Sequence, residues 1–413
     1  MWTELLLAVA LGSPLVEPTL EGDTLVVVPD TRSALVGMRL SLPAGRLSPW
    51  WWSADASAAW HLPLASPDLT RRIDALMSFH LASDDWNTTL SAQFRARDFD
   101  DAIATLSEFL TGGPIGRDTL RAWRSAGRGP WQTPQHTLSV MLKRMLLDPR
   151  DLRRQPAPGP PRGLTRLQQT RTALLSLRDR IIGFTGDVSI DQARASVATL
   201  LPPHAASLPA GITAKPIPIP PVAGGVRTGW LPGGGQGAVV LARSSMAKTD
   251  PDYPALQVAL HALAGGIRSR LLLALRHESG LIYSLSADDG AGAIPGLLTV
   301  TIPARASQLS QTTAHAERLL SDFAAQGITP SEHTAAVRAL RRSTIPTTPD
   351  DVLLATMEAL RHDWPLDHSI TRIDTAESMP LATINTFIAD FFSPEVVALL
   401  RVLPASGLPP PPP

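Results

Sequence analysis

The sequence contains no cysteine. This absence excludes disulfide bonds, thiolate nucleophiles and thiolate metal ligands, so a zinc site in this chain would depend on histidine and carboxylate side chains. Net charge is also absent, because 37 Lys and Arg side chains balance 37 Asp and Glu side chains. A chain without excess positive charge lacks the attraction that draws proteins to nucleic acid or to an anionic bilayer, and we expect neither partner.

Long hydrophobic runs are absent as well. No stretch reaches the roughly 18 to 20 uninterrupted apolar residues that a membrane-spanning helix needs, so we expect no membrane span. Residues 1–18 include a short apolar run at residues 5–12, followed by Ser13 and Pro14. This segment fits a secretory signal, although Glu4 stands where a basic residue is usual, and it fits equally a segment that packs on the first domain. The first alternative implies a periplasmic protein and the second a cytoplasmic one.

The composition is that of a folded protein of more than one domain. The chain has 413 residues, of which 44% are hydrophobic and 18% charged, and its length favours two or three domains. Prolines and glycines concentrate between residues 201 and 235, where they exclude a regular helix. We therefore predict a first domain at residues 19–203, a linker at 204–235, a second domain at 236–405 and a Pro-rich tail at 406–413.

The two halves resemble each other in pattern. Residues 101–110 and 316–325 each form an amphipathic helical pattern that is followed by a Gly/Pro turn and a second helical pattern, and Phe109 and Phe323 occupy equivalent places. Residues 24–29, 35–42 and 237–243 have the pattern of strands. This predicts an α+β protein of two tandem homologous domains, each an antiparallel sheet with helices packed on one face. Chance similarity of amphipathic helices is the alternative.

The most informative segment is residues 252–289. Residues 253–264 have helical periodicity, two glycines interrupt it, a second helix follows over residues 269–277, and residues 281–287 alternate like a strand. This pattern resembles the second domain of the pitrilysin/insulinase zinc peptidases, also called inverzincins, in their bacterial processing-peptidase-like branch. The matching residues are Gly265, Gly266, Ser269, Arg270, Leu271, Leu275, Arg276, Gly280, Leu281, Tyr283 and Ser284.

The resemblance implies a role for Arg276 and Tyr283. In the family, the arginine before the turn and the tyrosine seven residues later hold the substrate and stabilise the oxyanion of the tetrahedral intermediate. A guanidinium and a phenol that converge on one carbonyl suit this chemistry. The alternative is that Arg276 forms a surface ion pair, for instance with Glu278, and that Tyr283 is a half-buried strand residue. Tyr283 is one of only two tyrosines in the chain, which favours the functional interpretation.

The zinc-binding motif that the family carries in its first domain is missing. Active relatives have His-x-x-Glu-His on a helix, with a distant glutamate as the further ligand. Here His61 fits the first ligand, but Leu64 and Ala65 replace the catalytic glutamate and the second histidine, and Pro63 disturbs the helix. No Asp or Glu occurs at residues 119–147, where the distant ligand is expected. We predict that this chain binds no metal and that His61 is a packing residue.

Two other features are weaker candidates for sites. The sequence HDWPLDH could hold a cation, although a solvated loop between helices is the better explanation; its side chains are His362, Asp363, Asp367 and His368. Three consecutive tryptophans suggest a partner contact, a cover over the lost metal site or simple packing of a loop; these are Trp50, Trp51 and Trp52.

The resemblance implies a pseudoprotease. Bacterial relatives often work as heterodimers in which one subunit carries the zinc motif and the other carries the Arg/Tyr pair. The leading hypothesis is therefore a non-catalytic subunit, without a cofactor of its own, whose partner is a zinc-bearing paralogous peptidase subunit and whose substrate is a peptide. The alternative is a structural or peptide-binding scaffold that takes no part in proteolysis.

Overall fold

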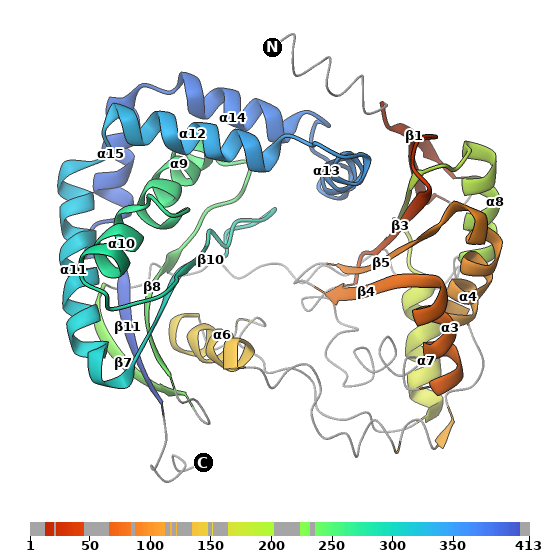
Figure 1. Cartoon of the computed structure of the whole chain (residues 1–413), viewed down its shortest axis with the longest axis horizontal. Coiled ribbons are helices and arrows are strands. Elements are labelled where there is room, and N and C mark those ends of the chain that lie inside the picture. Colours follow the sequence, from red (N-terminus) through yellow and green to blue (C-terminus); the bar gives the residue numbers. More distant parts are fainter. Residues whose placement is uncertain are drawn as a thin grey trace. The chain divides into compact units, whose positions relative to one another are not determined.

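The computed structural model describes residues 13–19, 22–44, 66–83, 87–111, 134–147, 164–201, 224–231 and 236–404, together with Gly116, Arg117, Arg121 and Asp151. The chain divides into two compact units, and each is described by itself (Figure 1). Unit 1 comprises residues 1–131, 155–215 and 346–366, and unit 2 comprises residues 132–154, 216–345 and 367–413. Within the described ranges, no helix is both long and apolar enough to cross a bilayer.

Unit 1 contains a six-stranded sheet with the strand order β1-β2-β6-β3-β5-β4. Strands β2 and β6 run parallel, and the other neighbours pair antiparallel. The described elements are β1 (Leu15–Pro18), β2 (Thr24–Pro29), β3 (Leu35–Leu42), α3 (Pro67–Leu76), β4 (Met77–Ser83), β5 (Thr88–Arg95), a 3-10 turn (Ala96–Asp98), α4 (Phe99–Thr111), α7 (Leu164–Leu175), β6 (Ile181–Gly186), α8 (Ile190–Leu200) and α13 (Pro349–Arg361).

Unit 2 contains a five-stranded sheet with the strand order β7-β11-β8-β10-β9. Helices α9, α11, α12, α14 and α15 lie to one side of it and α6 to the other (Figure 1). The described elements are α6 (Pro134–Leu146), β7 (Gly225–Leu231), β8 (Gly237–Ser244), α9 (Tyr253–Ala264), α10 (Arg270–Leu272), a π-helical turn (Leu273–Glu278), β9 (Ser286–Asp288), β10 (Leu297–Ala304), a 3-10 turn (Ala306–Gln308), α11 (Leu309–Gln326), α12 (Pro330–Thr344), α14 (His368–Ser378), α15 (Leu381–Phe391) and β11 (Ala398–Pro404).

The two sheets share one topology. Apart from β1, the order β2-β6-β3-β5-β4 corresponds to β7-β11-β8-β10-β9, and in both sheets the first pair is parallel while the others are antiparallel. In each unit the fourth of these strands leads through a 3-10 turn into a long helix, and that helix buries Phe109 in unit 1 and Phe323 in unit 2. The α+β fold of two similar halves, predicted from the sequence, is therefore confirmed.

Two helices lie with the sheet that is remote from them in sequence. Helix α6 precedes the linker, yet its Leu142 and Leu146 pack on Val240 and Leu400 of the second sheet. Helix α13 follows the linker, yet it packs on β2 and β6 of the first sheet. The structural units are thus discontinuous, unlike the contiguous segments 19–203 and 236–405 expected from the sequence.

Because α6 and α13 pack in this way, the helical layers around each sheet differ from those predicted. The prediction placed helices on one face only, but apolar side chains alternate to both faces of the central strands, and both faces must be covered. In β2, Leu25 and Val27 belong to the core under α4, while Val26 and Val28 belong to the core under α13. In the described part of the chain, each sheet is therefore a middle layer, with α13 or α6 on the face opposite the main helical layer.

Candidate functional site

Helix α9 ends at two glycines, and His261 lies close to the first of them. A Cβ atom on Gly265 would lie 2.4 Å from His261 Nδ1, and Gly266 has a φ of +80°, which other residues rarely adopt. Burial lowers the pKa of His261, and the charge of Arg342 lowers it further. Ser269 Oγ then donates a 2.9 Å hydrogen bond to the carbonyl oxygen of Gly266. These residues of the motif shape the turn into α10.

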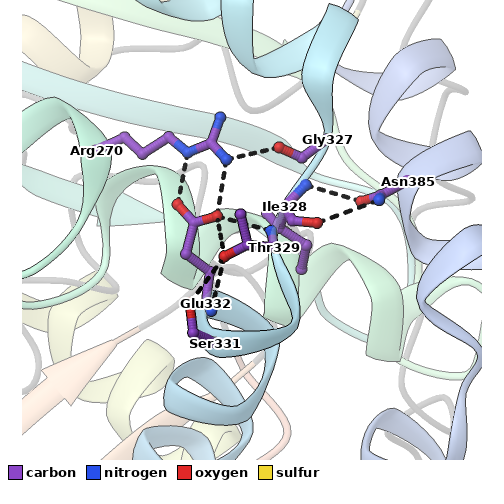
Figure 2. Close-up of polar contacts among 7 residues, drawn as sticks. All are labelled: Arg270, Gly327, Ile328, Thr329, Ser331, Glu332 and Asn385. Atoms are coloured by element: carbon purple, nitrogen blue, oxygen red, sulfur yellow. Dashed lines mark hydrogen bonds and ion pairs between the residues drawn. The ribbon is translucent and has the colours of Figure 1, made fainter.

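Arg270, the next motif residue, is held by a structural network (Figure 2). Its guanidinium donates to both carboxylate oxygens of Glu332, at 2.6 and 2.8 Å, and to the carbonyl oxygen of Gly327 at 2.7 Å. The ring of Phe323 lies 5.2 Å from Arg270 Cζ. Glu332 also accepts from the backbone N–H of Thr329 and completes the capping box of α12. Arg270 therefore ties α10 to α11 and α12.

The same network extends to α15. The Asn385 side chain accepts a hydrogen bond from the backbone N–H of Ile328 and donates one to its carbonyl oxygen, at 2.8 and 3.2 Å (Figure 2). The segment between α11 and α12 is thus held from α10 on one side and from α15 on the other. This frame fixes the start of the short helix that leads to Arg276.

The Arg270–Glu332 ion pair should make the stability of the protein depend on pH. The hydrogen bond from Arg270 is the main cause that lowers the pKa of Glu332 from 4.5 to about 2. Because the folded-state pKa is lowered, the pair stabilises the protein fully above pH 4.5 and loses this effect as the pH falls toward 2. We expect Glu332→Gln to reduce the free energy of unfolding by roughly 1 to 3 kcal/mol at neutral pH. Urea unfolding measured against pH should show this difference shrinking below pH 4.5.

An exposed glutamate without an ion pair provides the control for this measurement. Glu317 on α11 is exposed and forms no ion pair among the described residues. We expect Glu317→Gln to leave the stability of the protein nearly unchanged across the same pH range. A wild-type advantage over Glu332→Gln that stays constant down to the lowest pH measured would contradict the proposed origin of the effect.

A π-helical turn, Leu273–Glu278, brings the chain back on itself after α10. The carbonyl oxygen of Leu275 accepts hydrogen bonds from the backbone N–H groups of Leu281 and Ile282, at 2.8 and 3.3 Å. Gly280 makes the reversal possible with a φ of +62°. Leu275, Leu281 and Ile282 are all buried. Tyr283, the residue after Ile282, therefore lies beside the turn. Turns of the π-helical type occur frequently at functional sites.

Arg276 and Tyr283 meet on the surface at this place. Arg276 Cζ lies 4.9 Å from the centroid of the Tyr283 ring, which is the geometry of a cation–π contact. Tyr283 is 80% exposed, and Arg276 is half-buried. Within the described part of the chain, the Arg276 side chain forms no ion pair or hydrogen bond. The N–H groups of its guanidinium therefore remain available for an oxygen atom of another molecule.

The geometry departs from two details expected for this pair. Tyr283 was predicted on a strand that begins at Leu281, but the strand is only Ser286–Asp288, and Tyr283 lies in the loop before it. The backbone of Leu281 and Ile282 is bonded to the preceding turn instead of to β10, which delays the strand. The alternative in which Arg276 pairs with Glu278 is not found among the described residues.

The other candidate sites have less support from the structure. His61, Leu64 and Ala65, like Trp50, Trp51 and Trp52, lie outside the described residues. The ring of His362 packs on Trp364 with centroids 4.6 Å apart, at the end of α13. Across the described ranges, no group of three or more His, Cys, Asp or Glu side chains could hold a metal ion. The described residues of HDWPLDH therefore do not form a cation site with this many ligands.

Sequence patterns did not find the long-range partners of the motif. Glu332 lies 62 residues from Arg270, and the Tyr253 hydroxyl donates a 2.6 Å hydrogen bond to Asp289, 36 residues away. Neither carboxylate could be predicted from a local spacing pattern. The only signal for Tyr253 was the rarity of tyrosine, since the chain has two.

Comparison with known proteins gives a family match over part of the chain. Residues 165–340 match the family model described as the peptidase M16 inactive domain. A segment of 110 residues is 34% identical to an uncharacterized zinc protease from Streptomyces coelicolor. This match covers 27% of the present chain and 24% of that relative, so the chain spans about a quarter of the curated protein that it matches.

Solved structures match over nearly the whole chain. The peptidase M16 inactive domain from Pseudomonas fluorescens superposes with a TM-score of 0.78 at 18% identity, covering 95% of this chain and 98% of that one. A protease from Helicobacter pylori gives 0.74 at 14% identity, with coverage of 95% and 100%. The periplasmic protease PqqL from Escherichia coli gives 0.67 at 14% identity, covering 95% of this chain but 45% of that one. The resemblance read from the sequence is confirmed: residues 165–340 match the peptidase M16 inactive domain, and the chain has the fold of M16-like peptidases.

Proposed function

We propose that this chain is the non-catalytic subunit of a heterodimeric zinc peptidase, in which Arg276 and Tyr283 contact the peptide while a paralogous partner holds the zinc. The observation that carries the proposal is the Arg276–Tyr283 contact. Both side chains are accessible at the surface, and the Arg276 side chain has no carboxylate partner among the described residues. A structural arginine usually has such a partner, as Arg270 does.

The chemistry of the pair suits peptide hydrolysis. A guanidinium donates hydrogen bonds to a peptide carbonyl and so orients the scissile bond, and a phenol donates to the oxygen that becomes negative in the transition state. The stack on Tyr283 restricts the rotation of Arg276, so less entropy is lost when a substrate binds. Zinc on the partner would supply the activated water, and this chain would supply the donors.

Two observations support a subunit without its own metal. The matched family model is that of an inactive domain. Leu64 and Ala65, at the positions where the family motif needs its glutamate and second histidine, have no side-chain atoms that bind zinc. A zinc-bearing relative of this chain is the simplest source of the missing half of the active site.

A scaffold without any role in proteolysis is the second candidate. The Arg270 network favours it to a limited extent, because that motif residue serves the fold alone. The same explanation does not extend to Arg276, which anchors no other described element. We therefore prefer the non-catalytic subunit that contributes Arg276 and Tyr283 to the active site of a partner.

The experiment is reconstitution. We expect the purified chain to contain no stoichiometric zinc, to cleave no peptide alone, and to form a stable complex with a coexpressed paralogue that carries an intact His-x-x-Glu-His. The complex should cleave peptides, and the isolated paralogue should be much less active. Elemental analysis, size-exclusion chromatography and steady-state peptide cleavage measure these quantities.

Two results would contradict the proposal. One tightly bound zinc per chain in the isolated protein would show that it has its own metal site. A paralogue with full activity in the absence of this chain would show that the Arg/Tyr pair is not required, and the scaffold would then be the better explanation.

A further inference from the structure

Tyr283 lies in a segment near the sheet edge, in which Leu285 is partly buried against the core of unit 2. We call residues 281–289 the tyrosine segment. Its first two residues, Leu281 and Ile282, are buried, but all three residues of β9 are exposed. Among the described strands, β9 lies at the edge of the sheet and pairs with β10, through Asp288, Ala287 and Ser286 opposite Thr299, Val300 and Thr301. A short edge strand without buried side chains is weakly held.

The far end of the tyrosine segment has a separate anchor. Asp289 follows β9 directly, and its Oδ2 accepts a 2.6 Å hydrogen bond from the hydroxyl of Tyr253 at the start of α9. The other carboxylate oxygen accepts from the backbone N–H of Ala291 at 2.9 Å. Tyr253 is itself buried and lies under the guanidinium of Arg372, 5.1 Å from Arg372 Cζ to the ring centroid. The anchor therefore belongs to the helical layer and not to the sheet edge.

The two ends of the tyrosine segment are thus held by different parts of unit 2. At the first end, the Leu275 carbonyl oxygen holds Leu281 and Ile282. At the other end, Tyr253 holds Asp289. Between them, Tyr283 has the contact with Arg276 as its described side-chain interaction. The position of the Tyr283 ring then depends on both ends being fixed.

We infer that Tyr253 is a positioning residue, whose hydrogen bond to Asp289 keeps Tyr283 stacked on Arg276. Tyr253 is buried and touches no substrate in this scheme. Its effect on catalysis rests on the proposed function, but its effect on the position of Tyr283 does not. The two tyrosines of the chain would then be coupled, because the buried Tyr253 would fix the position of the exposed Tyr283 ring.

The chain provides a direct spectroscopic test, because it has only two tyrosines. Incorporation of 3-fluorotyrosine should give two ¹⁹F resonances, and Tyr253→Phe leaves only that of Tyr283. Arg276→Ala supplies the reference position for an unstacked Tyr283. We expect Tyr253→Phe to shift the Tyr283 resonance most of the way to this reference. Asp289→Ala breaks the same hydrogen bond, together with the one from the Ala291 N–H, and should shift the resonance at least as far.

A variant that loses a comparable hydrogen bond elsewhere is the control. Thr88 in unit 1 is buried, and its hydroxyl donates a 2.7 Å hydrogen bond to the carbonyl oxygen of Ala44. Thr88→Val removes that bond and should leave the Tyr283 resonance in place. An unchanged Tyr283 resonance in both folded variants, Tyr253→Phe and Asp289→Ala, would overturn the inference.

Activity in the reconstituted complex provides the second test. If Tyr253 acts through Tyr283, Tyr253→Phe should lower kcat roughly tenfold when Tyr283 is present. In the Tyr283→Phe background, the same change should lower kcat less than about twofold, because the group that it positions is gone. An equal loss in both backgrounds would mean that Tyr253 serves general stability, and the positioning role would be wrong.

The ¹⁹F measurement and the activity measurement together distinguish a failure of this inference from a failure of the proposed function. If Tyr283→Phe alone leaves the complex fully active, the catalytic role of the pair fails, while the ¹⁹F shift still decides whether Tyr253 positions Tyr283. If Tyr283→Phe is inactive but the resonance does not respond to Tyr253→Phe, the proposed function stands and the positioning role fails.

Discussion

Tyr283→Phe is expected to lower the turnover of the reconstituted complex by roughly 100- to 1,000-fold. The change removes one hydrogen-bond donor to the developing oxyanion and leaves an aromatic ring for Arg276 to stack on. Because Tyr283 is 80% exposed, the loss of its hydroxyl should not affect the stability of the chain. Steady-state peptide cleavage measures the effect, and size-exclusion chromatography should show an intact complex.

Arg276→Ala should lower activity through both kinetic constants. If the guanidinium holds a substrate carbonyl in the ground state, KM should rise as well as kcat fall. Arg268 is the matched control, because it is an exposed arginine in the same turn region and no role is assigned to it. Arg268→Ala should leave both constants within about twofold of the wild-type values.

The opposite outcome has a clear meaning. Full activity of an intact complex that contains Tyr283→Phe would mean that the phenol takes no part in catalysis. Equal losses in Arg276→Ala and Arg268→Ala would indicate a general effect of positive charge on substrate binding instead of a specific contact. In the first case the scaffold function would replace the catalytic one, and in the second Arg276 would lose its specific role in contacting the substrate.

Leu353→Ala is expected to destabilise unit 1 by about 2 to 5 kcal/mol, although this residue lies in the C-terminal half of the sequence. Leu353 on α13 is fully buried against Val26, Val28 and Ile181 of the first sheet. Gly183 makes room for it, since a Cβ atom there would lie 2.4 Å from Leu353 Cδ1. Truncation leaves a cavity that the surrounding strands cannot fill completely.

The neighbouring residue on the same helix serves as the control. Leu354 is 43% exposed, and Leu354→Ala removes the same atoms and changes the helix propensity by the same amount as Leu353→Ala. We expect it to change the unfolding free energy by less than about 1 kcal/mol. Urea unfolding of both variants measures the difference. Equal destabilisation by the two changes would contradict the packing of α13 on the first sheet.

The elements with regular patterns were predictable from the sequence. Residues 24–29 and 35–42 were identified as strands from their apolar and β-branched residues, and they are β2 and β3. The match of Phe109 with Phe323 was visible because both lie on the buried face of an amphipathic helix. Local periodicity is sufficient for such elements, because it reports which face of a helix or strand is buried.

The predictions that were wrong concern features set by contacts that the local sequence pattern does not show. No pattern in residues 134–146 or 349–361 indicates which of two similar sheets the helix will cover, because either sheet offers an apolar face. The strand after the turn starts late because the Leu275 carbonyl captures two backbone N–H groups, and the local alternation of residues 281–287 cannot show this. The approach of Arg276 to Tyr283 was expected from a family resemblance and not from physical reasoning on the sequence.

The reciprocal placement of α6 and α13 affects how the protein can fold during synthesis. Every strand of the first sheet lies before residue 187, but α13 begins at residue 349. Until the ribosome has released that helix, Val26, Val28 and Ile181 lack the contacts that Leu353 and Met357 of α13 make with them. The N-terminal unit is therefore completed only after most of the C-terminal unit has been translated. A nascent chain of this kind depends on the speed of translation and on chaperones in the interval, when these contacts are not yet made.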